Sequence, residues 1–155
     1  MLGYRPTVNQ EVYESERDSS VRNRTIGHYL LEVEFLASDV KVTLETYFKQ
    51  CSIEITVDDL AKMGQILAHD GIDPYSQKEI IPMSIARMAK ALMVTCGMYN
   101  ASGNFATHVG LPAKSGVSGR IIALVPSRIQ NEKISFLQGC GIGVYGPALD
   151  KKGIA

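Results

Sequence analysis

Two polar side chains in the first part of the sequence have the chemistry of an amino-acid site. Glu16 and Asn23 stand seven positions apart. If the segment between them is helical throughout, both side chains project from one face, about two turns apart. A carboxylate can bind the ammonium group of a free amino acid, and an amide can bind its carboxylate. The same pair also fits an ordinary solvated helix face, so the spacing leaves both interpretations open.

Two short strings place a lysine near a hydroxyl group. Ser-Asp-Val-Lys at 38–41 matches Ser-x-x-Lys, in which an amine is the base of a serine nucleophile. Ser38 stands where a helix cap is expected, and we interpret this match as accidental. Lys114-Ser115-Gly116 precedes a predicted strand and resembles the Lys-Thr-Gly strand of serine β-lactamases and penicillin-binding proteins. An ordinary loop lysine is the alternative, and the tripeptide alone favours it.

Metal-ligating residues are scattered along the chain. The three histidines have no second ligand type at helical or hairpin spacing, and they fit surface or capping positions: His28, His69 and His108. The three cysteines stand 45 and 44 positions apart in apolar surroundings: Cys51, Cys96 and Cys140. This spacing predicts buried, reduced thiols in a cytoplasmic protein. No glycine-rich nucleotide loop is present, so we expect no metal and no other cofactor.

The composition narrows the class of protein further. The 155 residues are 45% hydrophobic and 21% charged, which excludes a disordered chain. Sixteen basic and sixteen acidic residues balance, so no surplus charge attracts nucleic acid or an anionic membrane surface. The longest apolar run, 121–125, is far below the ~20 residues of a membrane span. Zero net charge offers little self-repulsion and permits a homo-oligomer.

Helices are predicted in the first hundred residues. Residues 1–15 are polar and suggest a loosely held lead-in. Helices should follow through 21–30, from 38–39 to just before Cys51, and from a capping box at Thr56 and Asp59 to a stop at Gly71. A fourth helix, about 84–98, is apolar on more than one stripe and should be central. Its inward residues would be Ile85, Met88, Ala89, Leu92, Met93 and Cys96.

Strands are predicted near the carboxyl end. Ten of the fourteen glycines fall at or after Gly97, and β-branched runs suggest strands at 119–125, 133–137 and 140–145. Helices first and strands last predict an α+β fold, with a helical cluster over about 18–98 and a small antiparallel sheet over about 119–146.

Longer strings in the chain resemble the serine-dependent glutaminase family. Tyr-Phe-x-Gln-Cys-Ser at 47–52 and Thr-Cys-Gly-Met-Tyr at 95–99 are the most specific, and Gly-Leu-Pro-Ala-Lys-Ser-Gly-Val follows at 110–117. With Glu16 and Asn23, the resemblance runs in order from about residue 10 to residue 152.

The resemblance implies a β-lactamase and transpeptidase-like fold. It also implies hydrolysis of L-glutamine to L-glutamate and ammonia through a serine acyl-enzyme, without a metal. The substrate-binding residues that it implies are Glu16, Asn23, Tyr47, Tyr99 and Val117, the last through its backbone. Tyr47 and Tyr99 would be the catalytic phenols, and Lys114 and Ser115 would line the same cleft.

The sequence departs from the family pattern at both ends. The family's nucleophilic Ser-x-x-Lys, another substrate-binding Asn and much of its sheet belong to an amino-terminal portion, and a final helix follows the sheet. We therefore interpret 1–155 as a single partial glutaminase domain without these parts. A phenol with a pKa near ~10 is a poor nucleophile at neutral pH, so we expect little or no activity from this chain alone.

Two alternatives come from other classes. The first is a non-catalytic fragment that self-associates, or that complements a separate amino-terminal chain, through an exposed sheet edge and an apolar patch. The second and weaker one is a penicillin-recognising protein, which Lys114-Ser115-Gly116 alone suggests.

Overall fold

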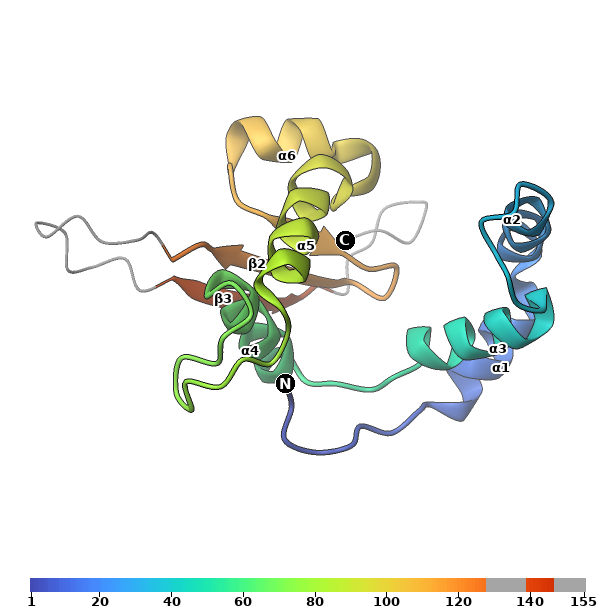
Figure 1. Ribbon diagram of the computed structural model, residues 1–155, viewed down its shortest axis with the longest axis horizontal. Coiled ribbons are helices and arrows are strands. Elements are labelled where there is room, and N and C mark those ends of the chain that lie inside the picture. The colour runs from blue at the N-terminus through green and yellow to red at the C-terminus, as the bar shows by residue number, and fades with distance from the viewer. Residues whose placement is uncertain (128–138, 147–155) are drawn as a thin grey trace, which may run out of the picture. The chain divides into compact units, whose positions relative to one another are not determined.

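The computed structural model describes residues 1–127 and 139–146, which fall into two compact units. The helical unit, Tyr4–Ile55, contains α1 (Gln10–Ser19), α2 (Val21–Glu32) and α3 (Val40–Cys51) (Figure 1). The sheet unit comprises Met1–Gly3 and 56–155. Its helices are α4 (Val57–Ala68), α5 (Met83–Cys96), the 3-10 helix η1 (Tyr99–Ala101) and α6 (Ser102–His108). Its strands are β1 (Ala113–Ser115), β2 (Arg120–Val125) and β3 (Cys140–Tyr145). This order confirms the α+β prediction.

The amino-terminal segment is held in place, so the predicted loose lead-in is wrong. Asn9 caps α1 by accepting a hydrogen bond from the Val12 amide at 3.0 Å. Val8 forms an isolated antiparallel bridge with Ile53, and the Asn9 amide donates to the Ser52 carbonyl at 2.8 Å. The only apolar residues of α1 are Val12 and Tyr13, and only Tyr13 is buried, so the sequence offers too few apolar positions to predict this helix.

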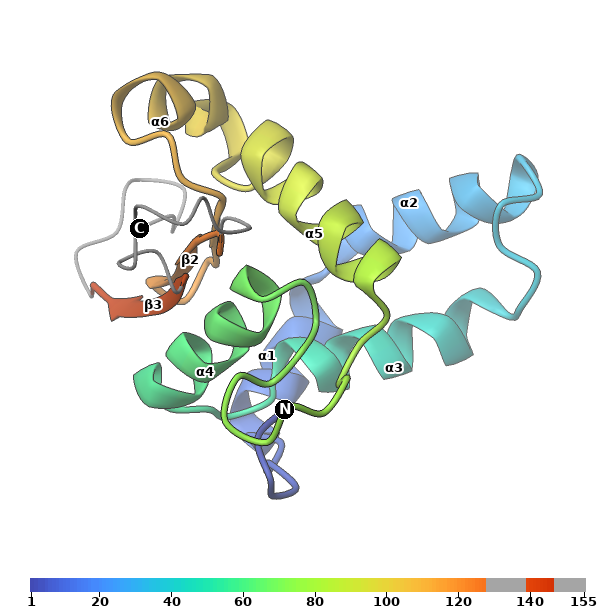
Figure 2. The ribbon, with the colours of Figure 1, turned by 60° about the vertical axis from the view of Figure 1, so that its left-hand side comes forward.

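Within the helical unit, α2 and α3 pack against each other, and Figure 2 shows the loop that joins their ends at the right of the view. A Cβ atom added at Gly27 would lie 2.8 Å from Cγ1 of Val40, so a larger residue would separate the two helices. Asp39, rather than Ser38, caps α3 by accepting from the Val42 amide at 3.0 Å. The Ser-Asp-Val-Lys string is therefore part of a helix start, in agreement with its interpretation as accidental.

The sheet unit is built around α4 and three antiparallel strands in the order β1-β2-β3. The predicted capping box is confirmed: the Asp59 amide donates to Oγ1 of Thr56 at 3.1 Å, and the Thr56 amide donates to Oδ2 of Asp59 at 3.0 Å. Helix α4 packs against β3 at Gly141, where a Cβ atom would lie 1.9 Å from the Ala61 carbonyl oxygen. The helix backbone can come this close only to a residue without a side chain.

Alternate residues of β2 join two different apolar clusters. Leu124 packs with Ala68 and Met93, and Ala123 packs with Met98 and Ala113. The two-residue period of a strand explains the alternation. The strand predicted at 119–125 is confirmed as β2, and that at 140–145 as β3. The strand predicted at 133–137 lies outside the described residues.

The turn after α4 is fixed by charge. Asp70, with φ of 54°, accepts hydrogen bonds from Arg87 at 2.9 Å and from Lys90, and both of these residues belong to α5. Burial raises the pKa of the Asp70 carboxyl, but the hydrogen bonds and positive charges of Lys90 and Arg87 together lower it by more. The net shift of the pKa is therefore downward. Gly71 follows with φ of 95°, in the left-handed conformation that glycine favours.

The prediction that α5 is a central helix is wrong for this chain. Met93 is buried, but Ile85, Met88 and Leu92 are 51%, 61% and 55% exposed. The helix packs through the stripe that contains Ala86 and Met93, and the second apolar stripe faces solvent.

The predicted burial of the cysteines is also wrong. All three are free and exposed. Cys51 ends α3, Cys96 ends α5 and Cys140 begins β3. The ends of helices and strands are more exposed to solvent than their centres. Apolar neighbours in the sequence do not reveal that a cysteine lies at such an end. None of the helices in the part of the chain that the structure describes is long and apolar enough to cross a membrane.

Candidate functional site

Two of the predicted substrate-binding residues share a cavity in the helical unit. Asn23 of α2 and Tyr47 of α3 both line a hollow of about 320 Å³, whose other walls are mostly aliphatic. The Tyr47 side chain is 45% exposed, while its neighbour Phe48 is only 2% exposed and meets the Tyr47 ring edge-on at 5.9 Å. Phe48 thus anchors α3, and the Tyr47 phenol stays accessible.

Glu16 lies on α1 and is half-buried. Its carboxylate accepts a hydrogen bond from the Ser20 hydroxyl at 3.4 Å. Ser20 has φ of −82° and ψ of 57°, and it separates α1 from α2. The condition that Glu16 and Asn23 share one continuous helix is therefore not met, because the chain bends at Ser20.

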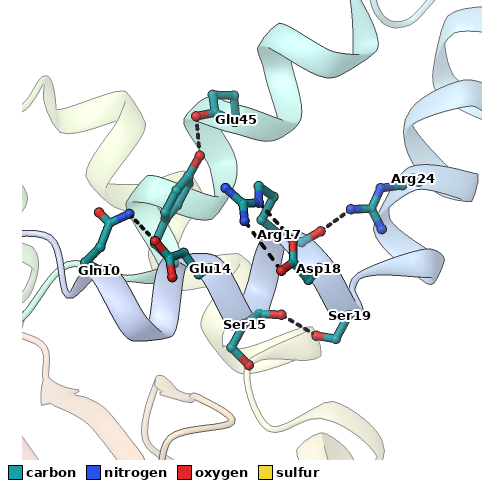
Figure 3. Close-up of polar contacts among 9 residues, drawn as sticks. Gln10, Glu14, Ser15, Arg17, Asp18, Ser19, Arg24 and Glu45 are labelled. Carbon is teal, nitrogen blue, oxygen red and sulfur yellow. Dashed lines mark hydrogen bonds and ion pairs between the residues drawn. The ribbon is translucent and has the colours of Figure 1, made fainter.

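Two arginines close to Glu16 in the sequence, Arg17 and Arg24, have other partners. Arg17 pairs with Asp18 at 2.9 Å, and the Arg24 guanidinium donates to the Arg17 carbonyl oxygen (Figure 3). The hydrogen bond from Arg17 lowers the pKa of the Asp18 carboxyl, as expected for a carboxylate beside a cation. None of the ion pairs found among residues 1–127 and 139–146 includes Glu16. Its negative charge is therefore available to a cationic group.

A second cavity of the helical unit was not predicted. It measures about 490 Å³ and has cationic and acidic side chains in equal number, Arg17, Arg24 and Lys41 beside Asp18, Asp39 and Glu45. Glu45, one of the residues that line this cavity, accepts a hydrogen bond from the Tyr13 hydroxyl (Figure 3). This bond favours the protonated phenol and so raises the pKa of Tyr13. The only signal in the sequence was the high charge density of 14–24 and 39–49, which is also typical of a solvated surface.

In the sheet unit, Tyr99 and Lys114 lie together. The Lys114 Nζ atom stands 4.4 Å from the centroid of the Tyr99 ring, in a cation–π contact. Tyr99 is 44% exposed, and its φ of 51° is unusual for a bulky residue. Ser115 occupies the opposite face of β1, is 1% exposed, and its hydroxyl has no hydrogen-bond partner within the described ranges.

Val117 occupies the tight turn between β1 and β2. The Gly116 amide donates to the Arg120 carbonyl at 2.8 Å, and the Gly119 amide donates to the Gly116 carbonyl at 3.2 Å. Val117 is 55% exposed, and no hydrogen bond from its amide is found within residues 1–127 and 139–146. This N–H can therefore donate to an oxygen atom of a ligand.

Two of the three histidines, His69 and His108, contact carbonyl groups of their own helices. Nδ1 of His69 lies 2.8 Å from the Gln65 carbonyl, and Nδ1 of His108 lies 2.9 Å from the Asn104 carbonyl. The prediction of capping positions is confirmed for these two residues. Among residues whose placement is described, no group of three or more His, Cys, Asp or Glu side chains could hold a metal ion.

Sequence comparison connects the whole chain to one family. The family model described as Glutaminase matches residues 1–155. The glutaminase of Oceanobacillus iheyensis is 61% identical over 153 residues, which are 99% of this chain and 46% of that protein. Glutaminase 1 of Bacillus subtilis is 53% identical over 153 residues, again 99% of this chain and 46% of the relative. The chain thus spans about half the length of the curated relatives that it matches.

Solved structures show the same relationship. The covalent complex between a Bacillus subtilis glutaminase and 5-oxo-L-norleucine superposes with a TM-score of 0.89 at 53% identity, over 98% of this chain and 51% of that one. Mglu in its glutamate form superposes with a TM-score of 0.85 at 37% identity, over 99% of this chain and 33% of that one.

Proposed function

The chain belongs to the glutaminase family, and we propose that it forms part of an enzyme that hydrolyses L-glutamine to L-glutamate and ammonia. The observation that carries this proposal is the family match over the whole chain. The Bacillus subtilis glutaminase complex with 5-oxo-L-norleucine and the glutamate form of Mglu support a ligand of this size and charge. We further propose a cytoplasmic homo-oligomer.

The helical unit supplies groups for the two charged ends of glutamine. The Glu16 carboxylate, which has no cationic partner among the described residues, would bind the α-ammonium group. The Asn23 amide would donate to the α-carboxylate, and Tyr47 on the same cavity would contact the substrate through its phenol. The aliphatic walls of that cavity suit the methylene groups of the side chain.

The sheet unit, taken by itself, has groups that could act on a side-chain amide. Tyr99 would assist proton transfer, and the cation of Lys114 would favour any negative charge that develops on or near its phenol. The unpaired Val117 amide would donate to the carbonyl oxygen of the side-chain amide as negative charge grows there. Lys114 would border this site, whereas the buried Ser115 side chain lies on the opposite face of β1.

The covalent step would need a nucleophile that these residues do not provide. A serine hydroxyl would attack the amide carbon while a lysine takes its proton, ammonia would leave, and water would release glutamate from the ester. The only Ser-x-x-Lys of this sequence, at 38–41, is a helix start. We therefore expect the chain alone to bind glutamine without hydrolysing it.

Calorimetric titration of the purified chain tests the binding part of the proposal. We expect L-glutamine to bind more tightly than 4-carbamoylbutanoate, which lacks the ammonium group. E16Q should remove this preference, because the amide cannot compensate the ammonium charge. Equal affinity for the two ligands, or an unchanged preference in E16Q, would contradict the assigned role of Glu16. Ammonia release from glutamine by the chain alone would contradict the expected inactivity.

A second candidate function is a non-catalytic fragment that self-associates or complements a separate chain. The exposed apolar stripe of α5, formed by Ile85, Met88 and Leu92, favours it. Size-exclusion chromatography with light scattering should then show an oligomer that L92S weakens. A monomer that binds no hydrophobic dye would refute this alternative.

A further inference from the structure

The backbone of Tyr99 has a conformation that needs support. Its φ of 51° lies in the left-handed region, where the Cβ atom of an ordinary residue crowds the following carbonyl. The other positive-φ residues with a side chain in the described chain are Glu34, Asp70 and Gln77, none of which is aromatic. Such a conformation persists only where neighbouring groups fix it, and it is frequent at functional sites.

One buried hydroxyl bonds to both sides of Tyr99. Ser102 is 6% exposed, and its Oγ accepts a hydrogen bond from the Met98 amide at 3.0 Å. The same hydroxyl donates to the Tyr99 carbonyl oxygen at 2.8 Å. Its donor and one acceptor lone pair are thus used on the two peptide groups at the ends of the Met98–Tyr99 segment, the one before Met98 and the one after Tyr99.

The Ser102 hydroxyl bonds backward along the chain. Ser102 is the first residue of α6 and follows the N-cap residue Ala101, which provides no side-chain cap. Its bond to the Tyr99 carbonyl, three positions earlier, is a common contact of serine in helices. The additional bond from the Met98 amide ties the same hydroxyl to the residue before Tyr99.

We propose that Ser102 is a positioning residue that holds Tyr99 in its left-handed conformation and thereby presents the phenol to glutamine. Ser102 fixes the backbone of Tyr99, while Lys114 lies over its ring. The part that concerns glutamine rests on the proposed function of Tyr99. The part that concerns the backbone stands on the two hydrogen bonds alone.

Nuclear magnetic resonance tests the backbone part directly. Backbone couplings of Tyr99 report the sign of φ, and we expect S102A to lose the positive value. Ser102→Thr keeps the hydroxyl and should keep the conformation. Ser52→Ala is the matched control, because Ser52 is 2% exposed and its hydroxyl donates only to the Phe48 carbonyl, at 2.8 Å. A positive φ at Tyr99 in S102A, or its loss in S102T, would overturn the inference.

A double-mutant cycle on glutamine binding tests the functional part. We expect Y99F and S102A each to weaken L-glutamine binding by about three- to tenfold, a typical loss for one hydrogen bond. The double variant should bind no more weakly than Y99F, because Ser102 acts through the phenol. A purely structural role of Ser102 would make the two losses additive.

The outcomes separate the two proposals. If Y99F binds glutamine like the unaltered chain, or if the unaltered chain does not bind it, the proposed role of Tyr99 fails and the couplings alone decide the role of Ser102. If Y99F weakens binding and S102A does not, the inference about Ser102 fails and the proposed function stands. S102T applies the same test even if S102A does not fold.

Discussion

At Gly97, the structure and helix propensity predict opposite effects of a substitution to alanine on the stability of the chain. Gly97 has φ of −69° and ψ of −27°, an ordinary helical conformation that alanine adopts easily. Propensity therefore predicts that G97A stabilises the chain by about 0.4–1 kcal/mol. In the structure, however, an added Cβ would lie 1.8 Å from the Ala113 carbonyl oxygen and 2.3 Å from the Met93 carbonyl oxygen. Both obstacles are backbone atoms, which cannot rotate away.

The loss of stability in G97A can be estimated from the parts of the structure that must shift to admit the methyl group. Relief of the contact would shift β1, at the sheet edge, and would stretch the hydrogen bond from the Ser115 amide to the Gly97 carbonyl, now 3.0 Å. Overpacking of a fitted site costs about 1–3 kcal/mol, and a lost hydrogen bond about 0.5–1.5 kcal/mol. After subtraction of the propensity gain, we expect G97A to lower the free energy of unfolding by about 0.5–4 kcal/mol.

Gly103 provides the matched control. It lies in α6 of the same unit, and nothing stands within 4 Å of an added Cβ atom. We expect G103A to raise the free energy of unfolding by about 0.5–1 kcal/mol, the usual gain for alanine in a helix. Urea denaturation followed by far-UV circular dichroism measures both variants. If G97A is as stable as G103A, the close approach of Gly97 to β1 is refuted.

Three further predictions concern the sheet unit, with the free energy of unfolding measured by urea denaturation. T56A removes the capping box of α4 and should cost about 0.5–2 kcal/mol; no loss would contradict the cap. L92A should change stability by no more than about 0.5 kcal/mol, whereas M93A should cost about 2–5 kcal/mol, because only Met93 is buried; equal losses would contradict the exposed stripe. The lowered pKa of Asp70 means that its contribution is present above the unfolded-state pKa, near 4, and is lost as the pH falls through the folded-state value. D70N should therefore lose less stability than the unaltered chain between pH 6 and pH 3, and parallel losses would contradict the pairing with Lys90.

Local signals in the sequence predicted most of the fold. The Thr56 capping box located the start of α4, because the required residue types lie three positions apart. Asn9 is an equally good cap for α1, but without an apolar stripe after it the same residue type also predicts a turn. A three-residue strand such as β1 is too short for alternation to be recognised.

Non-local features could not be predicted from the same patterns. Period 3.6 identified the helix of α5 but not which of its two apolar stripes is covered, since that depends on segments far away in the sequence. For the site, the seven-residue spacing places Glu16 and Asn23 on one face only if a single helix joins them, and the spacing cannot show whether it does. The bend at Ser20 is set by its φ and ψ angles, and no proline or glycine marks it.

The two phenols of the proposed site share an arrangement that separates them from ordinary exposed tyrosines. Tyr47 is 45% exposed beside Phe48 at 2%, and Tyr99 is 44% exposed beside Met98 at 8%. A single exposed aromatic residue is common and proves nothing by itself. A buried neighbour, however, fixes the backbone, so the phenol loses little entropy when a ligand binds. At Tyr99 the left-handed φ adds a conformational free-energy cost that packing alone does not explain. A requirement to hold the phenol in one direction does explain it.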